Sequence, residues 1–586
     1  MYMKTLKKDI SNKANFKAPF RGLGAILFWL FSILFLFSPF RGLGGSTFAQ
    51  TRTVGLMLNN TEKVYNGYTL FAPKQYHTTY LINNEGRVVH QWSKSTYPPG
   101  QSVYLLPDGH ILRSCMTTGR LSSGGGEGGR IEEYDWDDNL VWELDFSTDT
   151  YMQHHDIHIL PNGNIIMLVI EKKTLAECAA AGFNTANFQL DPKTQQLPAI
   201  VLPDYVAEIK PTYPKGGTVV WEWHTWDHLI QDFDATKLNY GTPKQHPELV
   251  DCDGDTKKLP AFWNHMNSID YNEQFDQIAL SVRGNSEVWI IDHGTTTAEA
   301  KSHAGGKRGK GGDLLYRWGN PICYGAGTSA DQRYFQQHDV EWVKPGYPGA
   351  GNLTCFDNGL GRGGSKIYST VDEFTPAVDV NGNYAVTVGS KFLPATYSWF
   401  YQADAVNPMY SENISGAERL PNGNTIICSG TVGEFREVTS AGEVVWKYVC
   451  PVQQNGPITQ GVAPDADAAR AGETMNSVFR VYKYPPDYAA FTGRSLVPGD
   501  FIEKYPSALN QQAQNYITIY PNPFTDKLRI ANAAGNEDYS LTGLNGTTIW
   551  NGKEIEKQNF SSLNNGIYVL KAESENKVQY LKIIKN

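Results

Sequence analysis

The sequence predicts an all-β protein, a six-bladed β-propeller followed by a small C-terminal β-sandwich. Three observations support this prediction. Patterns with a helical period of 3.6 are nearly absent, whereas short apolar runs separated by glycine-containing turns recur along the chain. The 586 residues include 56 glycines, 14 tryptophans and 32 tyrosines, a composition typical of many strands and turns. A chain of this length exceeds one ordinary core, so we expect several domains or one large repeat architecture.

The N-terminus has the order of a secretory signal peptide. Lysines precede an apolar run at residues 25–37, and a small-x-small sequence, Thr47-Phe48-Ala49, comes after it. We expect a signal peptide over residues 1–49 with cleavage after Ala49. The apolar run is about 13 residues long, shorter than the roughly 20 that span a bilayer. An uncleaved membrane anchor is the alternative.

One phrase returns through the predicted propeller, residues 50–500: an apolar strand, an Asn-Gly or Asp-Gly turn, and a second apolar strand. It occurs as LLPDGHILRS (105–114), ILPNGNIIML (159–168) and RLPNGNTIIC (419–428), with looser copies at 269–282 and 378–388. Asn-Gly and Asp-Gly supply the positive φ angles of tight hairpins. The first looser copy opens a stretch of three predicted strands: 267–271, 277–282 and 287–292.

A second hairpin with a tryptophan in its last strand often comes after the first. Its copies lie at residues 139–146, 216–224, 311–319 and 442–449. Paired hairpins at irregular spacing of roughly 45 to 75 residues are typical of four-stranded propeller blades. With an N-terminal unit at 68–92 the count is five or six, so we predict six blades, with seven or eight as alternatives.

Three insertions interrupt the repeats. Residues 172–203 are partly helical at 174–181, residues 298–312 are rich in glycine and lysine, and residues 456–473 are polar. Such loops lie on the faces of a propeller and can cover its central funnel.

The pattern changes after residue 500. A polar linker at 501–515 precedes a unit at 516–586 that alternates cleanly and reads as a small β-sandwich. This unit resembles the C-terminal sorting domain of the type IX secretion system, through four motifs: Tyr520–Pro523, Leu541–Gly546, Gly566–Val569 and Lys582–Lys585. The resemblance implies export through the periplasm, the type IX machinery as partner, and a secreted or cell-surface location.

Composition restricts the possible ligands. The net charge of −9 gives no basic face for nucleic acid. The seven cysteines contain no CxxC pair, so zinc spacing is absent; export permits disulfides, but the odd number leaves one thiol unpaired. Asp251, Asp253 and Asp255 alternate as calcium ligands do, although Phe262 stands where an EF-hand has glutamate. The alternative to a calcium site is an exposed turn. We predict no other cofactor, and the sequence makes no prediction of the oligomeric state.

All thirteen histidines lie in the first 338 residues. His155, His265 and His338 each precede the first hairpin of a different predicted blade, so propeller symmetry brings them toward one axial funnel. Neutral and cationic groups that converge on one cavity suit an oxyanion substrate. His293 and Arg283 lie at other strand ends. The alternative for each histidine is a structural role in the core or in a turn.

Six segments of the predicted propeller resemble the bacterial aryl-sulfate sulfotransferase family: residues 264–292, 291–300, 311–321, 336–343, 352–362 and 415–424. The resemblance implies a six-bladed propeller that moves a sulfuryl group from a phenolic sulfate ester to a phenol, without a nucleotide donor, through a sulfated histidine.

By motif, His265 and His338 match catalytic histidines of that family and Arg362 matches its arginine in the FDNG phrase. Arg283 is expected beside them in the funnel and, with His155 and His293, is a candidate for substrate binding. The arginines would hold the sulfate oxygens of a loose transition state, and a histidine would transfer the phenolic proton or accept the sulfuryl group.

The chain departs from the family in its last blade, where the family has its nucleophilic histidine. No histidine comes after His338, and the corresponding strand reads GTVGEFREV, with Glu434 or a neighbour at that place. Either His338 or His265 is then the nucleophile, or donor and acceptor react directly, or sulfate transfer is lost.

We therefore predict an exported aryl-sulfate sulfotransferase. The alternative is a non-catalytic cell-surface propeller that binds sulfated or glycan ligands. A quinone-cofactor propeller dehydrogenase is disfavoured because its vicinal cysteines and regular tryptophan repeats are missing.

Overall fold

The computed structural model describes residues 52–117, 121, 124–191, 194–252, 259–363, 367–405, 408–505 and 517–586, except 532, 534, 545 and 575–576. The predicted signal peptide at 1–49 lies outside these residues, as do Asp253 and Asp255 of the predicted calcium loop and most of the predicted linker. In the described part of the chain, every helix is too short or too polar to cross a membrane.

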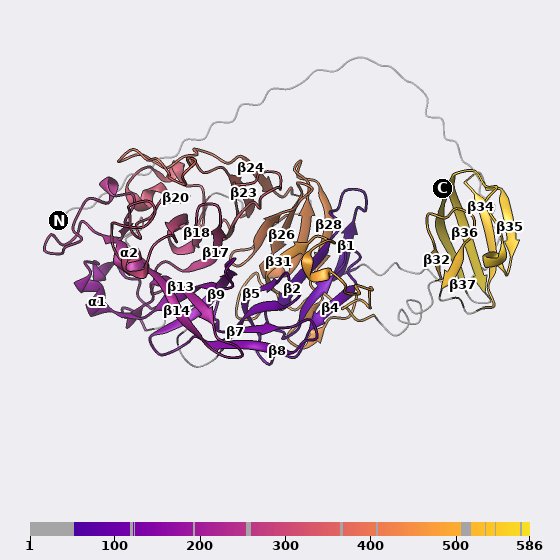
Figure 1. The fold of residues 1–586 in the computed structure, drawn as a ribbon, viewed down its shortest axis with the longest axis horizontal. Coiled ribbons are helices and arrows are strands. Elements are labelled where there is room, and N and C mark those ends of the chain that lie inside the picture. The colour runs from indigo at the N-terminus through magenta and orange to yellow at the C-terminus, as the bar shows by residue number, and fades with distance from the viewer. Residues whose placement is uncertain are drawn as a thin grey trace, which may run out of the picture. The chain divides into compact units, whose positions relative to one another are not determined.

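Six antiparallel sheets of four or five strands succeed one another along the chain (Figure 1). Each sheet is given from its innermost strand outward. The first sheet consists of β5 (Pro99–Leu105), β6 (Ile111–Met116), β7 (Gly129–Tyr134) and β8 (Leu140–Asp145). The second sheet consists of β9 (Tyr151–Ile159), β10 (Ile165–Glu171), β13 (Asp204–Pro211) and β14 (Gly217–His224). The third sheet consists of β17 (Met266–Asn272), β18 (Gln277–Val282), β19 (Glu287–Asp292) and β20 (Tyr316–Trp318). The fourth sheet consists of β21 (His338–Trp342), β22 (Leu353–Asp357), β23 (Thr370–Phe374) and β24 (Trp399–Gln402). The fifth sheet has five strands: β25 (Gly416–Arg419), β26 (Thr425–Ser429), β27 (Glu434–Val438), β28 (Val444–Val449) and β1 (Gly55–Asn59). The sixth sheet consists of β31 (Val478–Tyr484), β2 (Tyr68–Pro73), β3 (Thr79–Ile82) and β4 (Val88–Trp92).

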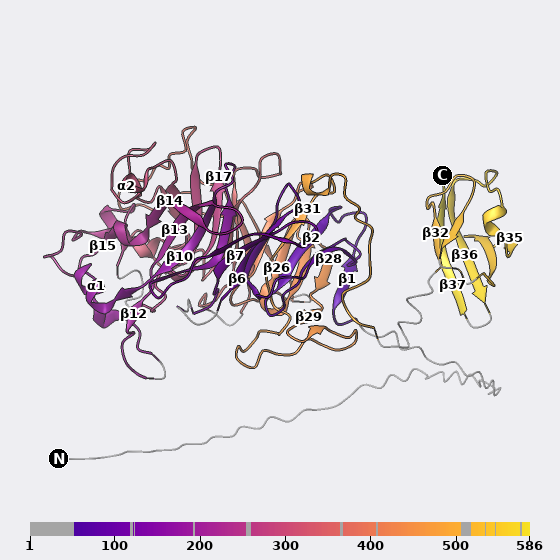
Figure 2. The same cartoon turned by 60° about the horizontal axis from the view of Figure 1, so that its bottom comes forward.

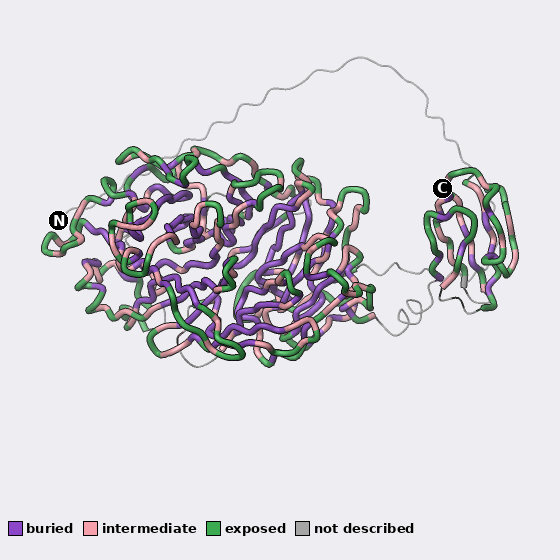
Figure 3. The backbone as a smooth tube through the Cα atoms, in the orientation of Figure 1, coloured by how far each residue is buried: buried purple, intermediate pink, exposed green. Residues whose placement is uncertain are grey.

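Two pairings between the ends of this region close the sheets into a ring. The N-terminal strand β1 pairs with β28, and the late strand β31 pairs with β2 (Figure 2). The innermost strands contact one another in the cyclic order β31, β5, β9, β17, β21, β25, and they are largely buried (Figure 3). The all-β propeller prediction is confirmed, and we interpret each of the six sheets as one blade.

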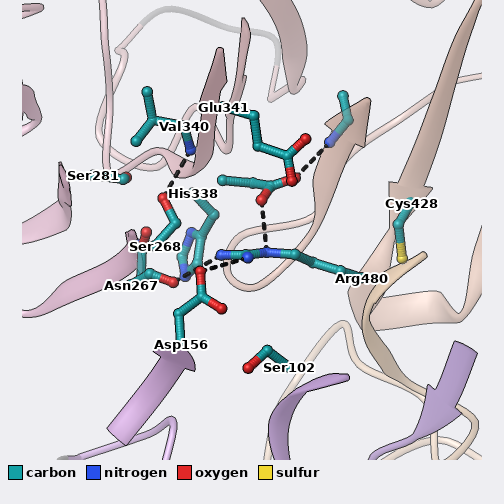
Figure 4. Close-up of polar contacts among 12 residues, drawn as sticks. Ser102, Asp156, Asn267, Ser268, Ser281, His338, Val340, Glu341, Cys428 and Arg480 are labelled. Carbon is teal, nitrogen blue, oxygen red and sulfur yellow. Dashed lines mark hydrogen bonds and ion pairs between the residues drawn. The ribbon is translucent and has the colours of Figure 1, made fainter. Parts of the chain in front are cut away.

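One arginine links the innermost strands at the axis. Arg480 of β31 contacts Asp156 of β9 and Asp339 of β21, each at 2.7 Å, and donates to the carbonyl of Asn267 on β17 at 2.9 Å (Figure 4). The two carboxylates also accept hydrogen bonds from the Tyr104 hydroxyl of β5, the Ile269 amide of β17 and the Ala417 amide of β25. All six innermost strands therefore meet in one buried polar network.

A second ring of contacts joins neighbouring blades farther out. The fourth strand of every sheet carries a tryptophan whose indole N–H donates, at 2.6 to 2.9 Å, to a backbone carbonyl just before the fourth strand of the next sheet. The six donor–acceptor pairs are Trp92–Asp135, Trp142–Gly216, Trp223–Gly312, Trp318–Pro394, Trp399–Ser440 and Trp446–Asn84. The sequence pattern predicted a tryptophan in the last strand of four of these sheets, but not the hydrogen bonds that join each tryptophan to the next sheet.

Most predicted hairpins are present. The strands predicted at 277–282 and 287–292 are β18 and β19, and the turn glycines Gly163 and Gly423 have φ angles of 83° and 86°. The hairpin predicted at 378–388 is wrong: it forms only an isolated bridge between Val378 and Tyr384. Tyr384 instead donates its hydroxyl to Gln277 of the neighbouring sheet, and the partner of β23 is β24.

The insertions carry the short elements. Helix α1 (Leu175–Ala180) has a Thr174–Glu177 capping box, which confirms the predicted helical segment. The others are β11 (Lys173–Thr174), β12 (Ile200–Val201), β15 (Leu229–Ile230), β16 (Val250–Asp251), α2 (Thr297–Ala300), β29 (Val452–Gln453), β30 (Gly456–Pro457), and 3-10 turns at 185–187, 225–228, 243–245, 283–285, 321–324, 329–331, 430–432 and 489–491. All seven cysteines are buried free thiols.

The C-terminal unit is a separate pair of sheets. One pairs β32 (Thr518–Tyr520) with β33 (Arg529–Ala531), and the other has the order β35 (Thr548–Gly552), β34 (Asp538–Gly543), β36 (Gly566–Ser574), β37 (Lys577–Lys585), with a 3-10 turn at 555–557. Phe524, Leu541, Leu570 and Ile583 are fully buried between them. This is the packing expected of the predicted small β-sandwich.

Candidate active site

The predicted imidazoles lie together where the innermost strands begin, at one end of the axis. His155 belongs to β9, His265 immediately precedes β17, and His338 opens β21. The rings of His155 and His265 have centroids 5.0 Å apart. Arg283 reaches the same region from the turn between β18 and β19, and the positive charge that it carries is one cause of the lowered pKa of both His265 and His338.

The backbone is strained at this end of the axis. His155 and His265 both have a φ angle of 48°, and Gln101 of β5, Asp339 of β21 and Ser415 just before β25 have φ angles of 112°, 62° and 86°. Such conformations cost roughly 1–3 kcal/mol each in residues other than glycine. Register shifts in β5, β9, β17 and β21 accompany them. Repetition of the same bulge around the ring indicates a shaped site, because bulges re-aim side chains.

His155 is buried and covered. Its Nδ1 lies 2.8 Å from Nδ1 of His154, whose Nε2 lies 2.8 Å from a carboxylate oxygen of Asp204. Burial lowers the pKa of His155 well below its usual range, and His265 adds to this effect. Gly126, in the glycine-rich segment at residues 124–129, packs on the ring so closely that a Cβ there would lie 2.0 Å from it. His155 is therefore a neutral imidazole with little space around it.

His338 has both ring nitrogens occupied. Nδ1 lies 2.7 Å from the Asn358 side-chain oxygen, which accepts its proton, and Nε2 accepts from the Ile414 amide at 3.2 Å. Burial lowers the pKa of His338 well below its usual range, with Arg283 contributing. The lone pair of this neutral ring is engaged, so His338 serves as a fixed wall of the site in this conformation.

His265 differs from its two neighbours. In the described chain its ring nitrogens make no hydrogen bond, and the residue is partly exposed. Burial lowers the pKa of His265 well below its usual range, and Arg283 adds to this. A neutral imidazole with a free lone pair is a competent nucleophile.

Arg283 is a half-buried cation that lacks a counter-ion. No hydrogen bond or ion pair of its guanidinium occurs within the described ranges, and burial lowers its pKa to about 10, with Glu412 partly opposing this. An unpaired charge removed from water is unfavourable. A bound anion would supply the missing partner.

Arg362 takes a different position. It pairs with Asp357 at 2.7 Å and lies over the ring of Tyr368 at 4.4 Å. Its Nε is buried without a hydrogen-bond partner among the described residues. Asp357 adjoins Asn358, the partner of His338, so Arg362 borders the cluster, but it makes no interaction with the three histidines in the described chain.

His293 lies apart from the cluster. Its Nδ1 contacts Asp276 at 2.7 Å and its Nε2 contacts Glu208 at 3.0 Å. Although burial lowers it, the pKa of His293 is raised to about 9, because its ring N–H groups donate hydrogen bonds to these carboxylates. The structure therefore places this candidate substrate-binding residue in an ion-pair network instead of the funnel.

The last-blade position also differs from expectation. Glu434 begins β27 and pairs with Arg436 and Lys447, away from the funnel. The turn at this end of the blade holds Thr431, whose hydroxyl lies 2.8 Å from that of Ser411. Sequence reasoning missed this hydroxyl pair, as it missed Asn358, although Asn358 lies in the FDNG phrase.

Fold and site together define a β-propeller with an imidazole- and guanidinium-lined end. Comparison with family models then gives two matches. Residues 201–455 match Arylsulfotransferase (ASST), and residues 518–586 match the Secretion system C-terminal sorting domain. Residues 201–455 of the propeller thus match an arylsulfotransferase domain, and both resemblances seen in the sequence are confirmed as family-model matches. The sorting domain indicates export to the cell surface or the medium, with the secretion machinery as a partner.

Known proteins add little beyond this. No curated protein matches the chain. Among solved structures, a protein from Bacteroides caccae is 11% identical with a TM-score of 0.36, covering 71% of this chain and 98% of its own. A streptogramin B lyase is 8% identical with a TM-score of 0.31, covering 75% and 95%. A periplasmic gluconolactonase from Pseudomonas aeruginosa is 11% identical with a TM-score of 0.30, covering 65% and 96%.

Proposed function

We propose that this protein is an exported aryl-sulfate sulfotransferase, which moves a sulfuryl group from a phenolic sulfate ester to a phenolic acceptor without a nucleotide donor. One observation carries the proposal: within the described ranges, a neutral His265 whose ring makes no hydrogen bond lies beside Arg283, whose guanidinium has no counter-ion. The catalytic unit is the propeller at 50–500, and residues 501–515 link it to the sorting domain at 516–586.

Arg283 would bind the sulfate group. Its guanidinium can donate two parallel hydrogen bonds to an oxyanion, which satisfies a charge that is now unpaired. The buried Nε of Arg362 offers a further donor at the border of the site. Phe262 and Phe479, whose ring centroids lie 6.3 Å from His265 and 6.1 Å from His155, can contact the aromatic ring of donor or acceptor.

The chemistry then proceeds in two balanced steps. A ring nitrogen of His265 attacks sulfur, the bond from sulfur to the phenolic oxygen breaks, and the departing phenolate takes the proton that the sulfated ring loses. The acceptor phenol next attacks the sulfur, its proton returns to the imidazole, and the N–S bond breaks. Cationic stabilisation of the non-bridging oxygens lowers both barriers.

The test uses 4-nitrophenyl sulfate as donor and phenol as acceptor, with phenol-dependent release of nitrophenol as the signal. His265→Asn and Arg283→Gln should each reduce turnover at least about 100-fold, because each removes a group that acts on the reacting atoms. His246→Asn, at an exposed histidine paired only with Glu248, should not change it. Donor without acceptor should add one SO₃ to the peptide that contains His265.

The results distinguish the assignments. Unchanged turnover in both variants would overturn this site. Sulfation of His338 instead of His265 would move the nucleophile, and turnover without any sulfated histidine would indicate direct transfer.

A second candidate is a non-catalytic propeller that binds sulfated or glycan ligands. It is favoured by the lack of a histidine in the last blade, where Glu434 or a neighbour stands at the position of the family's nucleophile. If an aryl sulfate binds in a manner that depends on Arg283 and no phenolic acceptor gives turnover, the result would support the non-catalytic propeller and exclude the sulfotransferase.

A further inference from the structure

A cavity opens at the opposite end of the axis from His155, His265 and His338. Its volume is about 1150 Å³, and it is lined where β5, β9, β17, β21 and β31 end and by the turns that come after them. The proposed sulfuryl transfer does not use this cavity. A ligand of the cavity is therefore independent of that proposal.

The Arg480 network separates the two ends of the axis. Tyr104 and Tyr482 line the cavity, and their hydroxyls bond to Asp156 and Arg480, respectively, on the axial side. A ligand in the cavity would therefore contact the underside of the network, away from His265.

Six tyrosines form much of the wall, and each has its hydroxyl engaged by the protein. The pairs are Tyr104–Asp156, Tyr213–Glu133, Tyr271–Asp276, Tyr482–Tyr104, Tyr484 with the Leu105 amide, and Tyr488 with the Leu105 carbonyl, all at 2.6 to 3.2 Å. With the hydroxyls held in this way, the tyrosines present ring carbon and π surface to a ligand. Such walls favour an apolar body or a cation.

The charged groups of the wall are mostly acidic. Lys344 pairs with Glu418 at 2.5 Å, and Asp270 accepts the Trp342 amide at 2.6 Å and contacts His158 at 3.3 Å. Glu341 of β21 also lines the cavity, and in the described chain its carboxyl has no hydrogen bond or ion pair.

We propose that this cavity binds an organic cation, with the ammonium group at the Glu341 carboxylate and the apolar body against the tyrosine rings. A carboxylate gives a charge-assisted hydrogen bond to an N–H donor, and aromatic faces attract the same positive charge. A neutral sugar would find the tyrosine hydroxyls already engaged. An anion would meet Glu341, Asp270 and the exposed Glu273 at the mouth.

Proton release should accompany binding. Burial raises the pKa of Glu341 well above its usual range, the carboxylates of Asp339, Glu418 and Asp270 add to this, and Lys344 opposes it. A cation at Glu341 favours the ionised carboxylate and therefore displaces a proton from it. The affinity for the cation should rise with pH until the raised pKa of Glu341 is passed.

The experiment is calorimetric titration of the full chain with three ligands that share one aromatic body: phenethylamine, 2-phenylethanol and 2-phenylethanesulfonate. We expect the amine to bind, the alcohol to bind at least about tenfold more weakly, and the sulfonate not to bind. Titration of the amine in buffers of different ionisation enthalpy should reveal released protons.

Two variants locate the site. Glu341→Gln should weaken amine binding at least about tenfold and abolish proton release, because it removes the ionisable partner. Glu273→Gln, the same change at an exposed carboxylate of the mouth, should alter affinity less than about twofold. If Glu341→Gln fails to fold, the three ligands and the proton release of the unmodified protein decide.

Several results would overturn the proposal: equal binding of amine and alcohol, amine binding without proton release, an amine affinity unaffected in a folded Glu341→Gln protein, or no amine binding at all. Preferred binding of the sulfonate would assign the cavity to anions instead.

Discussion

Replacing Arg480 with methionine tests whether the axial network holds the propeller together. The side chains of Arg480, Asp156 and Asp339 are 3%, 0% and 4% exposed, so the substitution leaves two buried carboxylates without their cation. Removing one partner of a buried pair costs about 3–5 kcal/mol, against a total stability of about 5–15 kcal/mol for a typical domain. We expect a loss of about 4 kcal/mol at pH 7.

The loss should depend on pH in a defined direction. Burial already raises the pKa of Asp339, and Arg480 counteracts this, so removal of the arginine raises that pKa further. Because the folded state then holds a proton that the unfolded state has lost, stability rises as pH falls through the folded pKa toward the unfolded value of about 3.9. The variant should therefore recover part of its stability at pH 5.

Urea unfolding monitored by tryptophan fluorescence measures both effects. Arg333→Met is the matched control, because Arg333 donates only to backbone carbonyls, and it should cost less than about 1 kcal/mol. Adding Asp339→Asn to the Arg480 variant should restore about 1–2 kcal/mol by removing an unpaired charge. A loss below about 1 kcal/mol at pH 7, or one that does not change with pH, would refute the reasoning.

Three further outcomes are expected. Trp223→Phe keeps a buried aromatic side chain but loses the indole hydrogen bond to the next sheet. It should lower the free energy of unfolding by about 1 kcal/mol in urea titrations, and no change would mean that the hydrogen bonds between neighbouring sheets are not stabilising. Gly126→Ala places a methyl group against His155 and should abolish sulfuryl transfer, whereas Gly163→Ala, with a similar positive φ and open space, should leave activity intact. Equal activity in both would remove His155 from the site. The stability that protonated His293 contributes is fully present below pH 6.5 and is lost as pH rises through its raised pKa of about 9. The difference in free energy of unfolding between the unmodified protein and His293→Gln, measured by denaturation, should therefore fall by on the order of 2 kcal/mol across this window.

Local patterns predicted the strands well. The segments at 277–282 and 287–292 match β18 and β19 because alternation and turn residues act within a few positions. The segment at 378–388 has the same Asn-Gly signal but serves a neighbouring sheet through Tyr384, a tertiary contact that no local pattern reveals.

Long-range contacts were harder to predict. His155, His265 and His338 could be brought together by symmetry, because each precedes the first predicted hairpin of a different blade. The sequence could not predict which of the three rings has a nitrogen without a hydrogen bond. This depends on Gly126, Asn358 and the Ile414 amide, which lie far away in sequence. Arg480 gave no signal at all, because one arginine in an apolar strand looks like a surface residue until the ring closes around it.

The late strand β31 has a consequence for the making of this protein. A nascent chain that stops before residue 478 lacks the last inner strand and Arg480, so it holds an open ring with unpaired edges and two uncompensated acids. The sorting domain begins only after this strand has been synthesised. Every molecule that displays the export tag therefore already contains the strand that closes the ring, and chains that terminate before residue 478 carry neither.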